Sequence, residues 1–313
     1  MLLSRVGGNL YWAARYLERA ASAARIVREH TNMLIDMPIN DRLTWEPLLS
    51  ISGALDTYST VHDTFDEASI IKWVVCEPSN PASLANSLEG ARENLRSTRE
   101  VIPTELWATV NDLFLYSEAQ LDHAIERAGR ARFCDRIVSD VQRCWGIVED
   151  SMRRDEANAL LALGRYVERA DMTTRVLDVR AVGLMGEGAD TPYVDLQWAG
   201  VLRSVSALQM YQRAVRSPVE GAEVIRFLMG DDAFPRSVRH NLAQLERITA
   251  TLPRAARPLQ ACAHARAVLS SRWDQLTGTD PAGLRVALDA VQMAIGQVSD
   301  SILATFVFPD GNP

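Results

Sequence analysis

The sequence predicts an all-α fold, a helical bundle built from two halves that are related by a pseudo-twofold axis. Three observations support this fold class. Alternating apolar runs of Val, Ile and Thr are scarce, so a β-sheet has little to be built from. Apolar residues instead recur at helical spacing, and a charged motif near the start of the chain returns in its middle. With 313 residues, of which 47% are hydrophobic, the chain can bury a sizeable core.

The helices of the first half follow from apolar spacing and from capping residues. Ser4 can cap a long helix that ends near residue 35. Further helices are expected near 43–60, 82–101, 104–128 and 133–152.

Proline-containing caps mark other helix starts. Asn80-Pro81 and Asp280-Pro281 each place a capping residue before proline, which is favoured at the first helical position. Ser217 is followed three residues later by Glu220, the form of a capping box. Loops with Gly or Pro are expected at 183–192 and 253–258.

An internal repeat defines the domain organisation. Segment 15–20 reads Arg-Tyr-Leu-Glu-Arg-Ala and segment 165–170 reads Arg-Tyr-Val-Glu-Arg-Ala, 150 residues later. Three weaker sequence matches have nearly the same offset. They are Trp45, Leu49, Leu55 and Tyr58 with Trp198, Leu202, Leu208 and Tyr211; Pro81 and Ser83 with Pro235 and Ser237; and Val141, Gln142, Gly146 and Asp150 with Val291, Gln292, Gly296 and Asp300. The repeat predicts halves at 1–152 and 153–306, followed by a tail at 307–313.

Charge and composition limit the function classes. The net charge is −7, from 33 basic and 40 acidic residues, whereas nonspecific binding to nucleic acid or to an anionic membrane needs a basic surface. We therefore expect neither partner. Lys72 is the only lysine, which excludes a Gly-Lys-Ser/Thr phosphate loop.

Cysteine and histidine usage predicts neither disulfides nor metal. The 4 cysteines form no CxxC pair, and reduced thiols are expected. The 5 histidines show no Glu-x-x-His spacing, so no metal and no cofactor are predicted. Arg5 follows the start too closely for a secretory signal or a membrane span, and a cytoplasmic location is expected.

The repeated motif forms a charged stripe on each of two helices. At 100° per residue, Arg15, Glu18, Arg19 and Arg25 fall within about a third of the helix circumference, opposite Leu17. The second copy has the same charged residues. They are Arg165, Glu168, Arg169 and Arg175. We call each set a charged ridge.

Three interpretations of the charged ridges are open. A solvated face explains them least well. Exposed positions usually change in sequence after a duplication, whereas the charged residues of the two ridges are identical. They can form a buried Arg–Glu network in which twin ridges meet. They can also line a cleft where arginines bind a carboxylate or phosphate and Glu18 and Glu168 hold them in place.

Two secondary sets of residues are weaker candidates. The first is a basic stripe that suits an acidic peptide or partner, although a solvated helix face explains it as well. The second lies in first helical turns, where free backbone N–H groups attract anions, although local capping is the commoner role. The first set is Arg92, Glu93, Asn94, Arg96 and Arg99, and the second is Ser83, Arg236 and Ser237.

These residues resemble the bacterial alpha-E proteins, predicted helical proteins named for a Glu-Arg motif. The resemblance extends over nearly the whole chain and includes segments 4–6, 10–12, 15–20, 80–83, 91–94, 164–172 and 234–238. The chain departs from the family pattern at 74–77, Val-Val-Cys-Glu, where an aromatic residue and an aspartate are more usual.

The resemblance implies that the protein acts together with other proteins. Genes of this family lie near an ATP-grasp amide ligase and a transglutaminase-like peptidase, which implies a non-catalytic partner in peptide synthesis or peptide tagging. The alternative is an enzyme that acts on a peptide or another anionic substrate. In that case arginines bind the substrate, and Glu18 or Glu168 orients them or acts as an acid or base.

Overall fold

The computed structural model describes residues 4–36, 44–185 and 193–307. These residues are helical with no β-strand, which confirms the all-α prediction. The chain divides into two compact units. The N-terminal unit is Asn9–Leu161, and the C-terminal unit combines the described parts of Met1–Gly8 and Ala162–Pro313. Most of the predicted tail at 307–313 lies outside the described residues.

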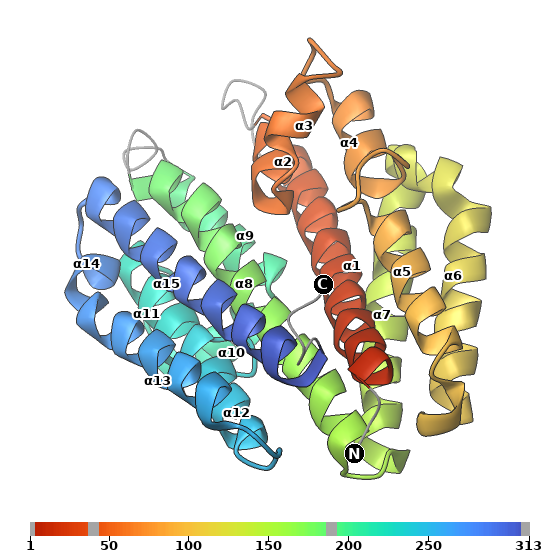
Figure 1. The fold of residues 1–313 in the computed structure, drawn as a ribbon. Helices are drawn as coiled ribbons and strands as arrows, with labels where there is room; N and C mark the ends of the chain where they lie inside the picture. The colour runs from red at the N-terminus through yellow and green to blue at the C-terminus, as the bar shows by residue number, and fades with distance from the viewer. Residues whose placement is uncertain (1–3, 37–43, 186–192, 308–313) are drawn as a thin grey trace. The chain divides into compact units, whose positions relative to one another are not determined.

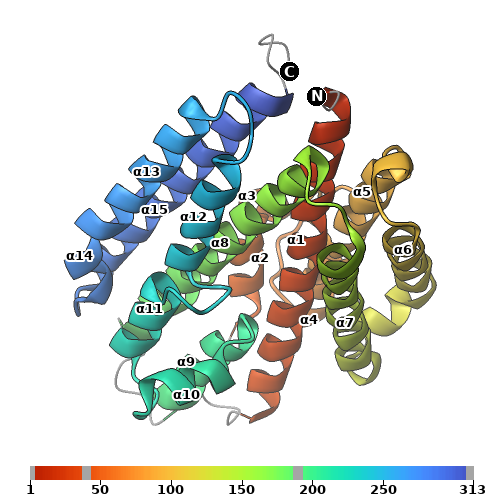
Figure 2. The ribbon, with the colours of Figure 1, turned by 90° about the horizontal axis from the view of Figure 1, so that it is seen from below.

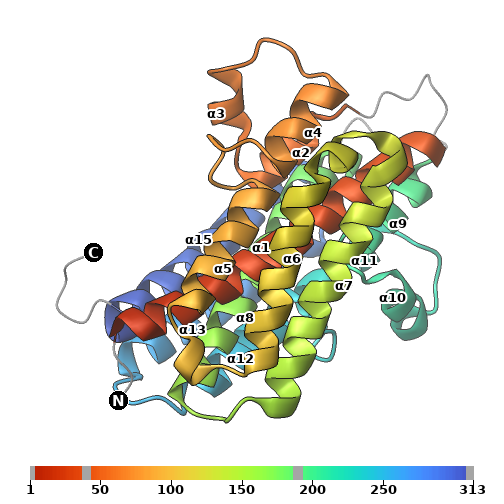
Figure 3. The same ribbon diagram turned by 90° about the vertical axis from the view of Figure 1, so that its right-hand side faces the viewer.

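The N-terminal unit is organised along one long helix. Hydrogen bonds join this helix to later ones, from Asn9 Nδ2 to Ser97 Oγ (2.7 Å) and from Arg28 to Asp135. Three of the later helices run side by side (Figure 3). The elements are α1 (Ser4–Asp36), α2 (Glu46–Ser52), α3 (Leu55–Ser59), α4 (Glu67–Val75), α5 (Leu84–Arg96), η1 (Arg99–Val101), α6 (Thr104–Ile125) and α7 (Arg127–Ser151).

Small residues let α1 pack closely. Its buried face is rich in alanine, which has the highest helix propensity and allows neighbouring helices to approach. Tyr16 lies against Gly90 of α5, where a built Cβ would come within 2.9 Å of the Tyr16 ring. The buried apolar residues of the first turns are Leu10, Tyr11, Ala13, Ala14, Leu17, Ala20, Ala21 and Ala24.

The predicted helix boundaries were partly wrong between 43 and 152. The expected helix at 43–60 is two helices, because Gly53 adopts a left-handed conformation (φ 72°) that ends α2. Helix α4 was not expected; it begins where Asp66 Oδ1 accepts a hydrogen bond from the Ser69 amide (3.1 Å). Helices α6 and α7 are separated only at Glu126, whose extended backbone makes the turn.

The C-terminal unit repeats this general order of a long helix, short helices and a terminal hairpin. Helices α13 and α15 lie side by side, and α12 packs on α13 (Figures 1 and 2). The elements are α8 (Glu156–Met185), α9 (Val194–Ser204), α10 (Leu208–Val215), α11 (Gly221–Gly230), α12 (Val238–Thr249), α13 (Ala256–Ser271), α14 (Trp273–Thr277), α15 (Pro281–Ile302) and the π-helical turn η2 (Leu303–Val307).

The proline-marked caps had mixed outcomes. Asp280 caps α15 as predicted, accepting hydrogen bonds from the amides of Ala282 (3.1 Å) and Gly283 (3.0 Å). The capping box at Ser217 was wrong, because α11 begins only at Gly221. Gly221 lies against the Trp198 ring, where a built Cβ would come within 2.5 Å of Cζ2, so this position has no room for a side chain.

Local hydrogen bonds at corresponding positions of the two units are alike. Ser83 Oγ accepts from the Asn86 amide (3.2 Å), and Ser237 Oγ accepts from the His240 amide (3.1 Å). Two buried tyrosines, Tyr58 and Tyr211, each donate a hydrogen bond to a carbonyl of the loop that follows. These parallels agree with the repeat seen in the sequence.

Helix α15 is the core helix of the C-terminal unit. The segment Pro281–Val307 is long and apolar enough to cross a membrane by length and composition, which the sequence analysis did not anticipate. Its apolar residues, however, bury one helical stripe against the unit, while Arg285, Asp289 and Asp300 are exposed. The stripe includes Leu284, Ala287, Leu288, Val291, Ala294, Ile295, Val298 and Ile302.

The two serine caps give the first prediction. Replacing Ser83 or Ser237 by alanine should each lower the free energy of unfolding by about 0.5–2 kcal/mol, because a helix-terminal amide loses its acceptor. Ser139→Ala, at an exposed position of α7, should change it by less than about 0.5 kcal/mol. Urea unfolding followed by circular dichroism measures all three, and equal effects would contradict the capping role.

Candidate functional site

The charged ridge on α1 is buried at its centre. Glu18 is 0% exposed and Arg25 is 1% exposed. Arg15 and Arg19 are half-buried, and their guanidinium groups lie over the rings of Trp12 (5.2 Å to the centroid) and Tyr16 (5.7 Å). Such cation–π contacts hold an arginine side chain against the helix surface.

The charged ridge on α8 has the same pattern of burial at its glutamate. Glu168 is 0% exposed, and Arg169 is 7% exposed. Arg165 is half-buried and lies over the Tyr166 ring at 5.9 Å, as Arg15 lies over Trp12. The two glutamates are thus alike in local sequence and in their own burial.

The last arginine differs between the two ridges. Arg25 is buried, whereas Arg175 is half-buried and donates from Nε to Asp171 Oδ2 at 2.9 Å. The residue at the position corresponding to Asp171 is Ala21, which carries no charge. Asp171 therefore gives Arg175 a local ion pair, and Ala21 cannot supply the equivalent carboxylate to Arg25.

The burial of both glutamates bears on the three interpretations. A solvated face does not describe Glu18 or Glu168, because neither side chain reaches solvent. A buried carboxylate is tolerated only with hydrogen-bonding or cationic partners. The structural network and the anion site both satisfy this condition. That the two ridges meet stays a prediction.

The secondary arginine set forms contacts between α5 and α6. Arg92 Nε donates to Asn111 Oδ1 (2.9 Å), and the Arg92 guanidinium lies 4.8 Å from the centroid of the Phe114 ring. Glu93 pairs with both Arg92 (2.7 Å) and Arg96 (2.8 Å).

The rest of this set lies at the end of α5. Arg99 lies over the Trp107 ring at 5.3 Å. The carbonyl of Asn94 accepts hydrogen bonds from Ser97 and Thr98. Arg92 is thus a packing residue between helices, while Arg96 and Arg99 are exposed and can still meet an acidic partner.

The set in the first helical turns has structural roles. The side chains of Ser83 and Ser237 are fully buried as helix caps. The carbonyl of Arg236 accepts a hydrogen bond from Thr173 Oγ1 on α8 (2.9 Å). The two serines therefore act as helix caps, which the sequence predicted as a commoner role than anion binding.

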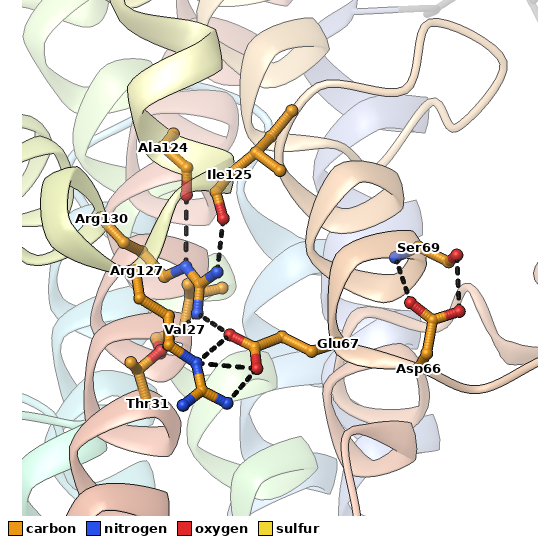
Figure 4. Close-up of polar contacts among 9 residues, drawn as sticks. All are labelled: Val27, Thr31, Asp66, Glu67, Ser69, Ala124, Ile125, Arg127 and Arg130. Carbon is orange, nitrogen blue, oxygen red and sulfur yellow. Dashed lines mark hydrogen bonds and ion pairs between the residues drawn. The ribbon is translucent and has the colours of Figure 1, made fainter.

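A buried charged cluster was missed by the sequence analysis. Arg130, 1% exposed, donates to the carbonyls of Ala124 (3.2 Å) and Ile125 at the end of α6 and pairs with Glu67 Oε1 on α4 (2.8 Å) (Figure 4). Arg127 also binds Glu67, with Nε at 2.7 Å from Oε1. Arg130 further donates to Thr31 on α1, so one guanidinium joins four helices.

Arg127 and Arg130 lower the pKa of Glu67. The hydrogen bond from Arg127 is the largest cause, desolvation opposes it, and Arg130 adds a further hydrogen bond and charge. No repeat or local motif marked this cluster, because Glu67 and Arg130 lie 63 residues apart on different helices. The cluster stabilises the N-terminal unit rather than offering a reactive group.

Burial raises the pKa of each cysteine thiol, Cys76 included. All 4 cysteines are free. Burial raises the pKa of Cys134 and Cys144 to about 12 and that of Cys262 to about 11, so these thiols are protonated at neutral pH. In the part of the chain that the structure describes, no group of three or more His, Cys, Asp or Glu side chains could hold a metal ion.

Comparison with known proteins identifies the family. The Alpha-E family, described as a predicted alpha-helical domain with a conserved ER motif, matches residues 2–307. This chain belongs to the Alpha-E family. Glu18-Arg19 and Glu168-Arg169 each contain an ER dipeptide, and in both the glutamate is fully buried.

Relatives of this Alpha-E protein are longer chains. Uncharacterized proteins of Mycobacterium bovis and Mycobacterium tuberculosis are 24% identical to it over 271 residues, which is 79% of this chain but 29% of each relative. A further Mycobacterium tuberculosis protein is 23% identical over the same length. The chain therefore spans less than a third of these relatives. No solved structure matches it.

The buried glutamates give the second prediction. Glu18→Gln and Glu168→Gln should each lower the free energy of unfolding by more than about 1 kcal/mol, because each removes a buried negative charge from a stripe of arginines. Glu118→Gln, exposed on α6, is the control and should have an effect below about 0.5 kcal/mol. An unchanged melting temperature for both ridge variants would contradict a structural role.

Glu67 gives the third prediction, a dependence of stability on pH. Because the folded-state pKa of Glu67 lies below its ordinary value, its contribution is complete above the unfolded-state pKa of about 4.3 and is lost as pH falls through the folded-state pKa. Glu67→Gln should therefore destabilise the protein by about 1.5–3 kcal/mol at neutral pH.

Denaturant unfolding at several pH values tests the Glu67 prediction. The difference between wild type and Glu67→Gln should shrink as pH falls below about 4. Glu118→Gln should show no such trend, since Glu118 is exposed. A difference that stays constant down to pH 2 would contradict an ionised, paired Glu67.

Proposed function

We propose that this Alpha-E protein is a non-catalytic helical partner of an ATP-grasp amide ligase and a transglutaminase-like peptidase, acting in peptide synthesis or peptide tagging. The identity of the partners rests on the family resemblance. We further propose a cytoplasmic location, where reduced thiols are expected. The 4 free cysteines are consistent with this location.

The full burial of Glu18 and Glu168 is the observation that carries the non-catalytic role. These glutamates are the acid or base candidates of the family motif, and a general base must come within hydrogen-bond reach of a substrate proton. A carboxylate at 0% exposure is better placed to hold arginines than to meet a substrate. The charged ridges then act as buried Arg–Glu networks within the helical scaffold.

The length of the relatives supports a role beside other domains. In the mycobacterial proteins the matching region is 29% of the chain, so the helical region there is covalently joined to further sequence. A helical unit that functions within a longer chain in one protein can function as a separate subunit in another. This argument favours a partner role without identifying the partner.

An anion-binding enzyme is the second candidate. It is favoured by the half-buried state of Arg15, Arg19, Arg165 and Arg175, because a partly exposed guanidinium can bind a carboxylate or phosphate bidentately. The exposed Arg96 and Arg99 suit an acidic peptide in the same way. In this alternative the buried glutamates orient the arginines.

We also propose that the chain arose by duplication of one helical half. The collinear sequence repeat, the similar helix order and the matching Ser83 and Ser237 caps support this origin. The halves proposed from the sequence are 1–152 and 153–306, and they carry one ridge each.

The fourth prediction concerns partners. A tagged chain purified from its native cells should enrich an ATP-grasp protein and a transglutaminase-like protein, identified by mass spectrometry. A matched bait carries Glu18→Lys, which should unfold because it buries a positive charge among arginines. Both partners should be lost with this bait. Absence of an ATP-grasp protein from the wild-type bait would contradict the proposed role.

A further inference from the structure

The outward face of α15 carries two widely exposed apolar side chains. Met293 is 65% exposed and Val286 is 55% exposed, among the largest exposures of apolar side chains in the described residues. They lie seven residues apart and therefore on the same side of the helix. Ala290, half-buried, lies between them, and Ala282 extends the face toward the start of the helix. Figure 1 shows the whole length of α15.

A glycine on this face has no structural reason within the unit. Gly296 is exposed in the interior of α15, and a Cβ built there meets no atom within 4 Å. Glycine destabilises a helix interior relative to alanine. The absence of a Cβ allows the backbone of a second helix to approach closely, as small residues do at helix contacts.

The corresponding face of α7 serves as an internal comparison. Gly146 occupies the position 150 residues before Gly296, and it too is exposed with no atom within 4 Å of a built Cβ. Where α15 has Val286 and Met293, however, α7 has the exposed arginines Arg136 and Arg143. The outward face of α15 therefore carries apolar side chains where the corresponding positions of α7 carry arginines.

The charges that flank this face are arranged to pair with a second copy of it. Arg285 lies eight residues before Met293 and Asp300 lies seven residues after it, and both are exposed. When two α15 helices lie antiparallel and cross at Met293, Arg285 of each copy comes beside Asp300 of the other.

We propose that α15 is the contact surface of a symmetric homodimer, in which two copies of this chain pack their α15 helices antiparallel about Met293. A twofold contact uses the same patch on both subunits, which matches the self-complementary order of charges. A lipid surface is a poorer occupant, because Arg285, Asp289 and Asp300 lie on or beside the apolar face.

The dimer is expected to be weak. One helix pair buries less than the roughly 1,600 Å² of a standard protein interface, so we expect a dissociation constant in the micromolar range. The proposal does not depend on the proposed ligase or peptidase partners.

Sedimentation of the purified full-length chain tests the proposal. Between about 1 and 200 µM the mass of wild type should rise from 34.7 kDa toward twice that value. Met293→Arg and Gly296→Arg should each weaken dimerisation by at least about tenfold. Gly146→Arg places the same side chain at the matching exposed glycine of α7 and should dimerise like wild type.

Two outcomes of this experiment would overturn the proposal. The first is a wild-type chain that stays monomeric up to the highest concentration. The second is dimerisation that Met293→Arg and Gly296→Arg leave unchanged. Circular dichroism of each variant confirms that the helices are intact, so a monomeric variant is not simply an unfolded one.

A charge exchange tests the antiparallel register. Arg285→Asp and Asp300→Arg should each weaken the dimer, because each places like charges side by side across the contact. The double variant should regain the wild-type association, because both inter-copy pairs are restored with reversed polarity. Arg285 also lies 3.9 Å from Asp178 of its own chain, and this contact is absent in both variants that carry Arg285→Asp. Failure of the double variant to dimerise would overturn the register.

Discussion

The burial of two glutamates, Glu18 and Glu168, is the constraint on which the rest of this structure depends. Removing a carboxylate from water costs several kcal/mol unless cationic or hydrogen-bonding partners compensate. Both side chains are fully buried on the longest helices of the chain, each within a stripe of arginines. Arginine suits this environment because its charge is permanent and its guanidinium presents several donors.

Much of the architecture could be predicted from the sequence, because it depends on local signals. The all-α class follows from helical spacing, and Asp280-Pro281 marked the start of α15. The helix breaks were harder, because they depend on packing or on a single residue. Gly53 divides an expected helix, and α11 starts at Gly221, against the Trp198 ring, instead of at the capping box. The periodicity of apolar residues predicts neither of these helix boundaries.

The charged residues could likewise be predicted where a local motif marks them, but not where their contacts join distant parts of the sequence. The ridges were predicted because the same motif occurs twice in the sequence. The cluster of Glu67, Arg127 and Arg130 was missed, because its members come from different helices and occur in one unit only. Arg92 shows an intermediate case. It was singled out as part of a basic stripe, but its contacts with Asn111 and Phe114 are between helices and could not be read from spacing.

Carboxylate footprinting tests the central claim most directly. The folded protein is treated with a carbodiimide and a small amine, and labelled glutamates are located by mass spectrometry. The account predicts that Glu18 and Glu168 stay unlabelled in the folded chain and react after denaturation, while the exposed Glu89 and Glu118 react in both states. Labelling of Glu18 and Glu168 in the folded chain at the rate of Glu118 would contradict it.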